Sequence, residues 1–556
     1  MNRYRSLPSR GIYRSNVMEP EDGEESPGIP GGAPTLMLLL DRFLRPRQGP
    51  VRFGIPSPAL LDWTLIFVLA LALRLHGLAA KPLWIDEVVT KLRVALPLQK
   101  LIANSLGHHH LPTYFLLLST FSPGANAWML RLPSAIGGAV AAAIGGAVGR
   151  TLGGRTAGLT SGLMLAGAPV MVQFGQDARP YALELAFLML ALWGLVTLVC
   201  DAEAASGPWR RGANAWAALL LGTAGALSLI GDAAPFLLSA NLSAWLIARC
   251  LSNLARRRFL FRWITCQASI LLVVGPLYLA MSRAVAGNYM VAFAWVPPLD
   301  ALRVWRIGAD VYLLRSANMV SLHLLPAALP GLMLVLPMLA VAGWIALRHR
   351  RAARASMILT FLSLPMLLFL IHPSHPLWLP RYLLWSGAVF LILTGVGTAW
   401  LTERWPLVGL AALVAVLLFN LFPFYRSETV PRWDLAATSL SPALAAGADV
   451  LVDDNAASMM LRAYLPGGDT ALPKGKLLTK PSEAEARLRA GVPVVAVHGP
   501  TGQGVTIPTA LFQAKLGPLG VPVREARIGH EIVLVWFNPL PNSTRTPLVS
   551  SVRPGP

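Results

Sequence analysis

Two adjacent carboxylates, Asp86 and Glu87, directly follow the first long apolar segment of the chain, in the stretch Lys81-Pro-Leu-Trp-Ile-Asp-Glu-Val. Trp84 precedes them and is a residue type suited to the membrane–water interface. Ionisable groups at that depth are costly to hold and are candidates for function. Carboxylates also stabilise the N-terminal end of a helix, so these residues alone favour capping and function about equally.

Further polar residues stand at the ends of apolar segments that the charge pattern, described below, places on the same membrane face. Asp177, Arg179 and Tyr181 lie in Gln176-Asp-Ala-Arg-Pro-Tyr, and Arg381 and Tyr382 open a later apolar segment. Carboxylates can act as general bases or bind hard divalent cations, and arginines bind phosphate in a fork. A single residue of this kind is more often an interfacial anchor. Their convergence from distant loops favours a functional site, with the two tyrosines as candidate substrate-binding residues.

Three consecutive histidines, His108, His109 and His110, precede a short apolar run. Three consecutive residues of a helix cannot all face one ion, so this run is not a predicted metal site. We select His110 as a residue that lines a cleft, because it stands just before Pro112 and Tyr114 on the predicted surface helix.

The composition is that of a membrane protein. The chain has 556 residues, of which 55% are hydrophobic and 13% charged, whereas a soluble domain is about a quarter charged. The formal charge of +20 comes largely from arginines between apolar segments, where they set topology. No basic stretch is interleaved with aromatic residues in a soluble context, so we predict no nucleic-acid partner.

Residues 1–58 are polar and rich in Pro, Gly and Arg, which predicts a disordered cytoplasmic tail. Residues 59–425 hold about eleven apolar segments, each near the roughly 20 residues that a span needs. Residues 81–127 are amphipathic and interrupted by Pro97, which predicts an external loop with two helices on the membrane surface. Arg74, near the end of the first span, is expected to reach the interface. The apolar segments lie near 60–80, 128–149, 157–174, 181–199, 214–230, 233–248, 263–281, 326–347, 355–371, 382–400 and 406–424.

Positive charge alternates between the loops. With the N-terminal tail inside, the cytoplasmic loops carry most of the arginines, which is the positive-inside pattern. This orientation places the candidate carboxylates and arginines outside, and the three cysteines inside, where no disulfide is expected. The arginines assigned to cytoplasmic loops are Arg150, Arg155, Arg210, Arg211, Arg249, Arg256, Arg257, Arg258, Arg262, Arg348, Arg350, Arg351, Arg354 and Arg404.

The remaining sequence predicts a small domain outside the membrane. Residues 426–540 alternate short apolar runs with one helical stretch, which predicts an extracytoplasmic α/β domain, and residues 541–556 are Pro- and Ser-rich and predict a disordered tail. Gly499 to Thr506 nearly fits a phosphate loop, but Val505 stands where the lysine is required, so we interpret it as a turn. Glycines at four-residue spacing from 145 to 162 predict close packing of two spans.

Several short stretches, taken together, resemble the GT-C superfamily of polytopic glycosyltransferases. The resemblance is strongest to the group that includes protein O-mannosyltransferases and the lipid A aminoarabinose transferase. It covers residues 60–425, where the stretches occur in the family's order. They are Leu83-Trp-Ile-Asp-Glu87, His110-Leu-Pro-Thr-Tyr114, Leu130-Arg-Leu-Pro-Ser-Ala135, Gln176-Asp-Ala-Arg-Pro-Tyr181 and Arg381-Tyr-Leu-Leu384.

This resemblance implies inverting transfer of a sugar from a polyprenyl-phosphate donor to a lipid, glycan or protein acceptor, on the external face of the bacterial inner membrane. It implies that Asp86 lines the active site as the base or as ligand of a divalent cation such as Mg²⁺ or Mn²⁺. Asp177 lies in the same cavity, and Glu87 is a supporting carboxylate. Arg381, with Arg179, is placed to hold the donor phosphate.

Two other functions stay open at this point. A secondary transporter would show internal repeats and broken spans with polar residues near the middle of the membrane. The two halves of this chain show no clear repeat, and its carboxylates cluster at loop ends. A catalytically inactive scaffold would use residues 426–540 to bind a partner, but that domain carries no recognisable binding motif.

Overall fold

The computed structural model describes residues 58–121, 126–204, 212–285, 296, 298–320, 322–326, 332–373, 377–468, 470–501 and 509–539. The predicted tails, except for Pro58, lie outside these residues. So do Arg210 and Arg211 of a predicted cytoplasmic loop and most of the predicted turn from Gly499 to Thr506.

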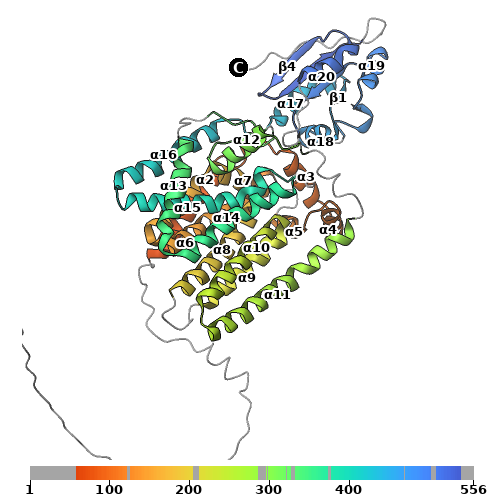
Figure 1. The fold of residues 1–556 in the computed structure, drawn as a ribbon. Helices are drawn as coiled ribbons and strands as arrows, with labels where there is room; N and C mark the ends of the chain where they lie inside the picture. The colour runs from red at the N-terminus through yellow and green to blue at the C-terminus, as the bar shows by residue number, and fades with distance from the viewer. Residues whose placement is uncertain are drawn as a thin grey trace, which may run out of the picture. The chain divides into compact units, whose positions relative to one another are not determined.

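Long apolar helices make up most of the described chain (Figure 1). Each predicted apolar segment contains a helix, and seven helices among the described residues are long and apolar enough to cross a membrane. The chain is therefore a polytopic α-helical membrane protein. Its apolar helices are α2 (Pro58–Leu75), α6 (Ala127–Gly167), α7 (Pro169–Gly175), α8 (Tyr181–Glu203), α9 (Gly212–Leu229), α10 (Ala234–Cys250), α11 (Asn253–Ala284), α13 (Leu332–Ala346), α14 (Arg351–Ile371), α15 (Leu384–Thr402) and α16 (Pro406–Arg426).

The helix α15, preceded by the short 3₁₀ helix η4 (Pro380–Leu383), is the most buried of the spans. Its apolar window is 94% buried, against 17% for α11. Glycine makes this possible, because a Cβ atom on Gly397 would lie 1.8 Å from the carbonyl oxygen of Leu339 in α13. The backbones of α13 and α15 therefore touch, as small residues allow in membrane helix packing. Arg381 and Tyr382 of η4 are consequently held in place by a helix that packs at the centre of the bundle.

The glycines between residues 145 and 162 pack two limbs of α6 against each other, as predicted. Gly153 and Gly154 have non-helical dihedral angles, and Gly154 has φ of 83°. This break divides the long helix into the two spans that the sequence predicts. A Cβ atom on Gly158 would lie 3.0 Å from the carbonyl oxygen of Gly146, so the limbs approach to backbone contact.

Arg74 is buried, contrary to the prediction that its side chain reaches the interface. The residue is 1% exposed, and its guanidinium donates to the carbonyls of Leu165, Ala166 and Met171 at 3.2–3.3 Å. These carbonyls belong to the last turn of α6 and to α7, on either side of the break between the two helices. Arg74 thus satisfies carbonyls that a helix end leaves without an intrahelical partner.

The first loop holds three short helices where the sequence analysis predicts two. They are α3 (Ile85–Val94), α4 (Leu98–Gly107) and α5 (Thr113–Phe121). Pro97 stands immediately before α4, and its fixed φ and missing N–H end the preceding helix and start the next. Further along the chain, α12 (Ala301–Tyr312) is another short amphipathic helix, which contacts η4 and α15.

The C-terminal part forms an α/β domain with a five-stranded sheet in the order β2-β1-β3-β5-β4. Strands β1 and β3 pair in parallel and β3 and β5 antiparallel. Alternate side chains of β1 point to opposite faces, where separate hydrophobic clusters contain residues of α17 and α18 on one face and of α19 and α20 on the other. The elements are α17 (Trp433–Ala445), β1 (Asp449–Val452), α18 (Asn455–Tyr464), β2 (Leu477–Leu478), α19 (Pro481–Arg489), β3 (Val494–His498), α20 (Thr509–Leu516), β4 (Arg524–Ile528) and β5 (Ile532–Phe537).

Candidate active site

Asp86 and Glu87 lie in the first turn of α3, directly after Trp84. The Glu87 carboxylate accepts a hydrogen bond from the Trp84 backbone N–H at 3.3 Å, so one of the two carboxylates does cap the helix. Thr90, one turn later, donates to the Asp86 carbonyl at 2.8 Å. The first turn of α3 therefore fixes both carboxylates, and they point into different surroundings.

Asp86 meets two arginines from distant loops. Its Oδ2 accepts a hydrogen bond from Arg381 Nη1 at 2.7 Å, and Arg179 Nε lies 4.0 Å from the same oxygen. The Asp86 side chain is 26% exposed, whereas both arginine side chains are nearly buried. The structure thus brings together three residues that the sequence analysis selects from separate loops, and the carboxylate is the one that solvent or a substrate can reach.

Glu87 is enclosed by hydrogen bonds. Its two oxygens accept from Arg131 Nε and Nη2, each at 2.6 Å, and Oε1 also accepts from the Ala178 backbone N–H at 2.9 Å. The side chain is 1% exposed. Arg131 in turn donates to the carbonyls of Leu78, Lys81 and Pro82 at 2.8–2.9 Å. Glu87 and Arg131 therefore join α3, α6, the turn after α2 and the loop of Asp177.

Asp177 is buried next to this ion pair. Its Oδ1 accepts from the Trp84 indole N–H at 2.9 Å, and its Oδ2 has no hydrogen-bond partner among the described residues. Burial, reinforced by the negative charge of Glu87, raises the pKa of Asp177 well above its ordinary value. Asp177 is therefore harder to ionise in this site than a carboxyl group in water.

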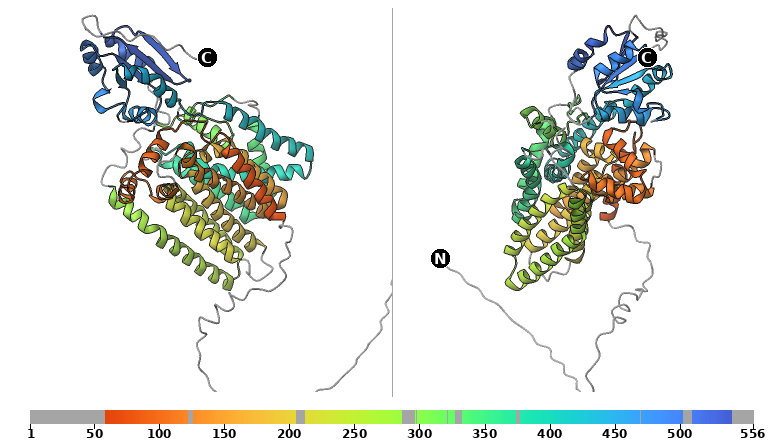
Figure 2. Two further views of the ribbon diagram at one scale, coloured as in Figure 1. Left: turned by 180° about the vertical axis from the view of Figure 1, so that it is seen from behind. Right: turned by 90° about the vertical axis from the view of Figure 1, so that its right-hand side faces the viewer.

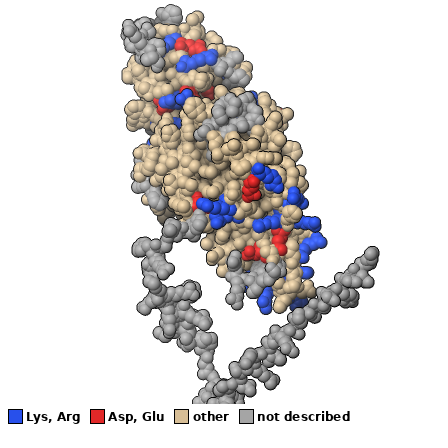
Figure 3. Space-filling view, turned by 90° about the vertical axis from the view of Figure 1, so that its left-hand side faces the viewer, with Lys and Arg blue, Asp and Glu red and all other residues tan. Residues whose placement is uncertain are grey.

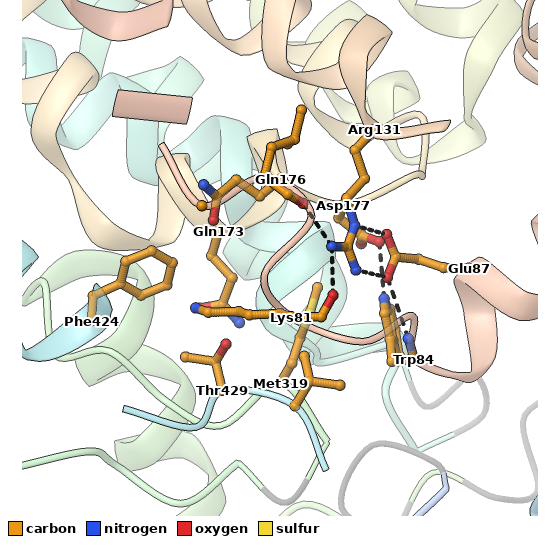
Figure 4. Close-up of a pocket in the computed structure, with 13 residues that line it drawn as sticks. Lys81, Trp84, Glu87, Arg131, Gln173, Gln176, Asp177, Met319, Phe424 and Thr429 are labelled. Atoms are coloured by element: carbon orange, nitrogen blue, oxygen red, sulfur yellow. Dashed lines mark hydrogen bonds and ion pairs between the residues drawn. The ribbon is translucent and has the colours of Figure 1, made fainter. Parts of the chain in front are cut away.

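A small cavity, lined by both polar and apolar side chains, lies next to Trp84 and Asp177 (Figure 4). About 20 Å³ of it is open to the centre of a water molecule, which is room for a single water. The ammonium of Lys81 reaches into this region and lies 4.0 Å from the ring centre of Phe424. The cavity is too small for a sugar or a lipid, so a substrate has to approach the carboxylates from the exposed side of Asp86.

Positive charge exceeds negative charge around Asp86. Arg93, which the sequence analysis did not select, is 4% exposed and donates from Nε to Asn104 at 2.9 Å. Burial, followed by the charge of Arg179, lowers the pKa of Arg93 to about 10. Arg93 stands seven residues after Asp86, and that spacing places the two on one face of α3. Three guanidinium groups near one exposed carboxylate make this face suited to an anion such as a phosphate.

His110 and Tyr114 also lie near these arginines. Burial, together with the charges of Arg179, Arg93 and Arg381, lowers the pKa of His110 well below its ordinary value, so its imidazole is neutral at pH 7. Tyr114 is fully buried, and its hydroxyl hydrogen-bonds Ser134 at 3.0 Å. Ser134 donates in turn to the Arg179 carbonyl at 2.9 Å.

The two remaining selected residues, Tyr181 and Tyr382, frame the arginine pair. Their rings meet edge to face, with centres 6.4 Å apart. The guanidinium of Arg381 lies 5.3 Å from the Tyr382 ring centre, and that of Arg179 lies 6.0 Å from the Tyr181 ring centre. The structure thus gathers the nine selected residues in one region, with Asp86 and the arginines at its centre and Tyr114 beneath the loop of Arg179. The part each plays in catalysis or binding stays a prediction.

The predicted Mg²⁺ or Mn²⁺ finds no ligand set here. Asp86 is a single carboxylate whose charge is met by Arg381 and Arg179. No group of three His, Cys, Asp or Glu side chains within the described residues is arranged to hold a metal ion. Mg²⁺ keeps several waters and needs only one or two protein carboxylates beside substrate phosphates. Asp86, paired with two arginines, is the partly exposed carboxylate available to such an ion, so the cation stays a prediction and the chemistry below involves none.

No known protein-family model matches this chain, and no curated protein matches its sequence. Solved structures do match its fold. ArnT from Cupriavidus metallidurans in the apo state matches with a TM-score of 0.51 and 14% identity, over 86% of this chain and 98% of that chain. ArnT from the same organism bound to undecaprenyl phosphate matches with a TM-score of 0.52 and 14% identity, over 85% and 98%. ArnT, the lipid A aminoarabinose transferase, is a GT-C glycosyltransferase. The chain therefore has the GT-C fold, as the sequence predicts.

Proposed function

We propose that this chain is a membrane glycosyltransferase that moves a sugar from a polyprenyl-phosphate donor to a hydroxyl of a lipid, glycan or protein acceptor. The observation that carries the proposal is the partly exposed carboxylate of Asp86 within reach of two buried arginines at the loop ends of the bundle. The fold it shares with ArnT, one structure of which holds undecaprenyl phosphate, supports the lipid class of the donor.

The arrangement can perform inverting transfer in one step. Asp86 takes the proton of the acceptor hydroxyl while that oxygen forms a bond to the anomeric carbon of the donor. The bond between the anomeric carbon and the phosphate oxygen breaks, and its electron pair stays on the phosphate. Arg381 and Arg179 stabilise the negative charge that develops on this leaving group. Attack from the face opposite the leaving phosphate inverts the anomeric configuration.

Donor binding has a second effect on Asp86. Arg381 donates a hydrogen bond to Asp86 Oδ2 at 2.7 Å, so this carboxylate oxygen is engaged by the arginine before the donor binds. A phosphate that binds Arg381 accepts hydrogen bonds from its guanidinium in place of Asp86, and the carboxylate is released. The carboxylate oxygen is thus freed for the acceptor hydroxyl when the donor is in place.

We also propose an orientation for the chain in the membrane. We place the N-terminus in the cytoplasm of a bacterial cell and the C-terminal α/β domain outside the inner membrane. The distribution of charge supports this, since Lys and Arg side chains concentrate toward one end of the helical part on the face drawn in Figure 3. Arg350, for example, donates to the carbonyl of Thr151 at 2.7 Å, at the break of α6 and away from the residues around Asp86.

The test is turnover of a polyprenyl-phosphate-sugar by the purified full chain in detergent, compared with Asp86→Asn. Loss of a general base costs about 10²- to 10⁴-fold in rate, so we expect turnover to fall by that factor while membrane insertion stays intact. Asp434→Asn is the matched control, because Asp434 also binds an arginine at 2.7 Å and is 29% exposed, but lies in α17. Full turnover by the Asp86 variant would remove this residue as the base.

A further inference from the structure

A large groove opens between α9 and α11, on the outside of the bundle. Its volume is about 470 Å³, enough for a hydrocarbon chain. The walls are mostly apolar and include Trp216 and Leu220 of α9 and Phe261 and Cys266 of α11. The groove shares no lining residue with the candidate active site.

The open side of the groove faces the membrane. α11 runs along the edge of the bundle in both Figure 1 and Figure 2, and its apolar window is only 17% buried. Phe261, Ile264, Leu271 and Leu272 are between 66% and 78% exposed on this helix. An apolar surface this large on a membrane-spanning helix is covered by lipid chains.

One end of the groove is polar and basic. Arg262 lines it, and a Cβ atom on Gly212 would lie 4.0 Å from Arg262 Nη1. Arg258 precedes Arg262 by four residues, which places the two guanidinium groups on one side of α11. Trp216, one turn into α9, also lines the groove and forms part of its apolar wall. Two arginines at the mouth of an apolar groove match the phosphate and an acyl chain of a phospholipid.

This polar end lies at the membrane face opposite the candidate active site. α9 contains 18 residues from Gly212 to Leu229, which is about 27 Å of helix. Its far end leads directly to Asp232, whose carbonyl accepts a hydrogen bond from Trp385, four residues after Arg381. A donor whose phosphate binds Arg381 therefore cannot place the same phosphate at Arg262.

We propose that the groove between α9 and α11 binds an anionic glycerophospholipid from the leaflet opposite the active site. Arg262, supported by Arg258, holds the headgroup phosphate, and one acyl chain fills the apolar groove beside Trp216. Basic pockets between membrane helices bind anionic headgroups in this way. The bound lipid completes the packing of α11, which the protein itself buries poorly.

The test is native mass spectrometry of the full chain, delipidated in detergent and titrated with phosphatidylglycerol. We expect one tightly held phosphatidylglycerol per chain and about a tenfold weaker affinity in Arg262→Gln, the change expected for one charge-assisted hydrogen bond. Arg256→Gln is the matched control, because Arg256 is an exposed arginine of the same helix that does not line the groove. Ala217→Leu, which adds volume to the apolar wall, should also weaken binding.

Three outcomes would overturn the proposal. Equal affinity in the Arg262 and Arg256 variants would mean that the lipid binds elsewhere. Preference for undecaprenyl phosphate over phosphatidylglycerol, lost in Arg262→Gln, would make the groove a site for the carrier lipid. A dimer of this chain that dissociates in Ala217→Leu would mean that a second copy covers the groove.

Discussion

Asp86 and Glu87 are neighbours in the chain, but they differ in exposure and in their hydrogen-bond partners. Asp86 is partly exposed and shares its charge with arginines at 2.7 and 4.0 Å. Glu87 is sealed behind Trp84 in a double hydrogen bond with Arg131. The sequence analysis predicts catalytic roles for both, yet the surroundings of Glu87 are those of a structural ion pair.

We therefore expect Glu87→Gln to lower the free energy of unfolding, with no direct effect on the chemical step. Removal of one partner of a buried ion pair costs about 3–5 kcal/mol, because the other charge stays buried without compensation. We expect a clearly lower temperature of thermal unfolding in detergent for Glu87→Gln, and little change for Asp86→Asn. A second change, Arg131→Met, should recover part of the loss. A Glu87 variant with normal thermal stability and no turnover would instead place this carboxylate in the reaction.

The amine of Lys81 makes folding depend on pH. Burial, followed by the charge of Arg131, lowers the pKa of Lys81 to about 7, against about 10.4 in an unfolded chain. Between these values the unfolded chain holds a proton on Lys81 that the folded chain does not. This group therefore makes the folded state more stable as the pH rises from 7 toward 10, and it opposes folding most strongly below pH 7.

Lys81→Met should remove this dependence. The methionine needs no proton in either state and keeps most of the apolar stem beside Phe424. We expect Lys81→Met to raise the unfolding temperature relative to the unchanged protein at pH 6, with the advantage shrinking toward pH 9. Lys91→Met on α3 is the control. An advantage for Lys81→Met that is the same at both pH values would show that the amine does not titrate on folding in this range.

Residue types and spacing predict that Asp86 and Arg381 lie at one membrane face, but neither their ion pair nor the depth of each group. The sequence places both at loop ends, where carboxylates and arginines converge. Arg93 could have been selected from its position seven residues after Asp86. The pairing of Glu87 with Arg131 depends on how α6 packs against α3, and no local sequence pattern predicts that packing. Burial therefore distinguishes Asp86, which a substrate can reach, from Glu87, which is enclosed in an ion pair.

At the level of elements, α18 holds the loop that carries Asp86. The hydroxyl of Tyr464, the last residue of α18, accepts a hydrogen bond from the Leu83 N–H and donates to the Leu83 carbonyl at 3.1 Å. Helices α18 and α3 also contact each other. Leu83 directly precedes Trp84, so the C-terminal domain fixes the entry to α3. The inactive-scaffold alternative assigns this domain to a partner, whereas this contact places it against the loop that carries Asp86.

Tyr464→Phe should therefore lower turnover through the position of Asp86. Loss of both hydrogen bonds costs about 1–2 kcal/mol, and we expect a kcat about tenfold lower with little change in KM for the donor. Tyr425→Phe is the control, since that hydroxyl donates to the Leu73 carbonyl in α2 instead. Equal losses in the two variants, or a change confined to KM, would contradict a positioning role for Tyr464.

The sequence predicts the membrane helices well because burial in lipid requires long apolar runs. It also predicts the limbs of α6, since glycines at four-residue spacing allow close backbones. It does not predict that Arg74 turns inward, because a single arginine near a helix end can reach either water or a free carbonyl. Pro97 does mark a helix boundary in the sequence, but the number of surface helices that result is three and not the predicted two.

For the whole molecule, the orientation in the membrane follows from which helix ends carry the site and which carry the arginines. α8 begins at Tyr181, beside the candidate site, and ends at Glu203, which accepts a hydrogen bond from the Ala352 N–H next to Arg351. α10 begins next to Asp232 and ends at Arg249 and Cys250. The ends opposite the site thus collect the positive charge, and the orientation proposed above rests on the positive-inside rule.

Cys250 provides a direct test, because it is exposed at the end of α10 opposite the site. We expect a membrane-impermeant maleimide to label Cys250 in spheroplasts only after permeabilisation. Val521→Cys, at a position 89% exposed in the C-terminal domain, should be labelled in intact spheroplasts when Cys250 is replaced by serine. The two sites report opposite sides, so each serves as the other's control for reagent access. Labelling of Cys250 in intact spheroplasts would invert the topology and put Asp86 in the cytoplasm, where a nucleotide-activated sugar would be the more natural donor.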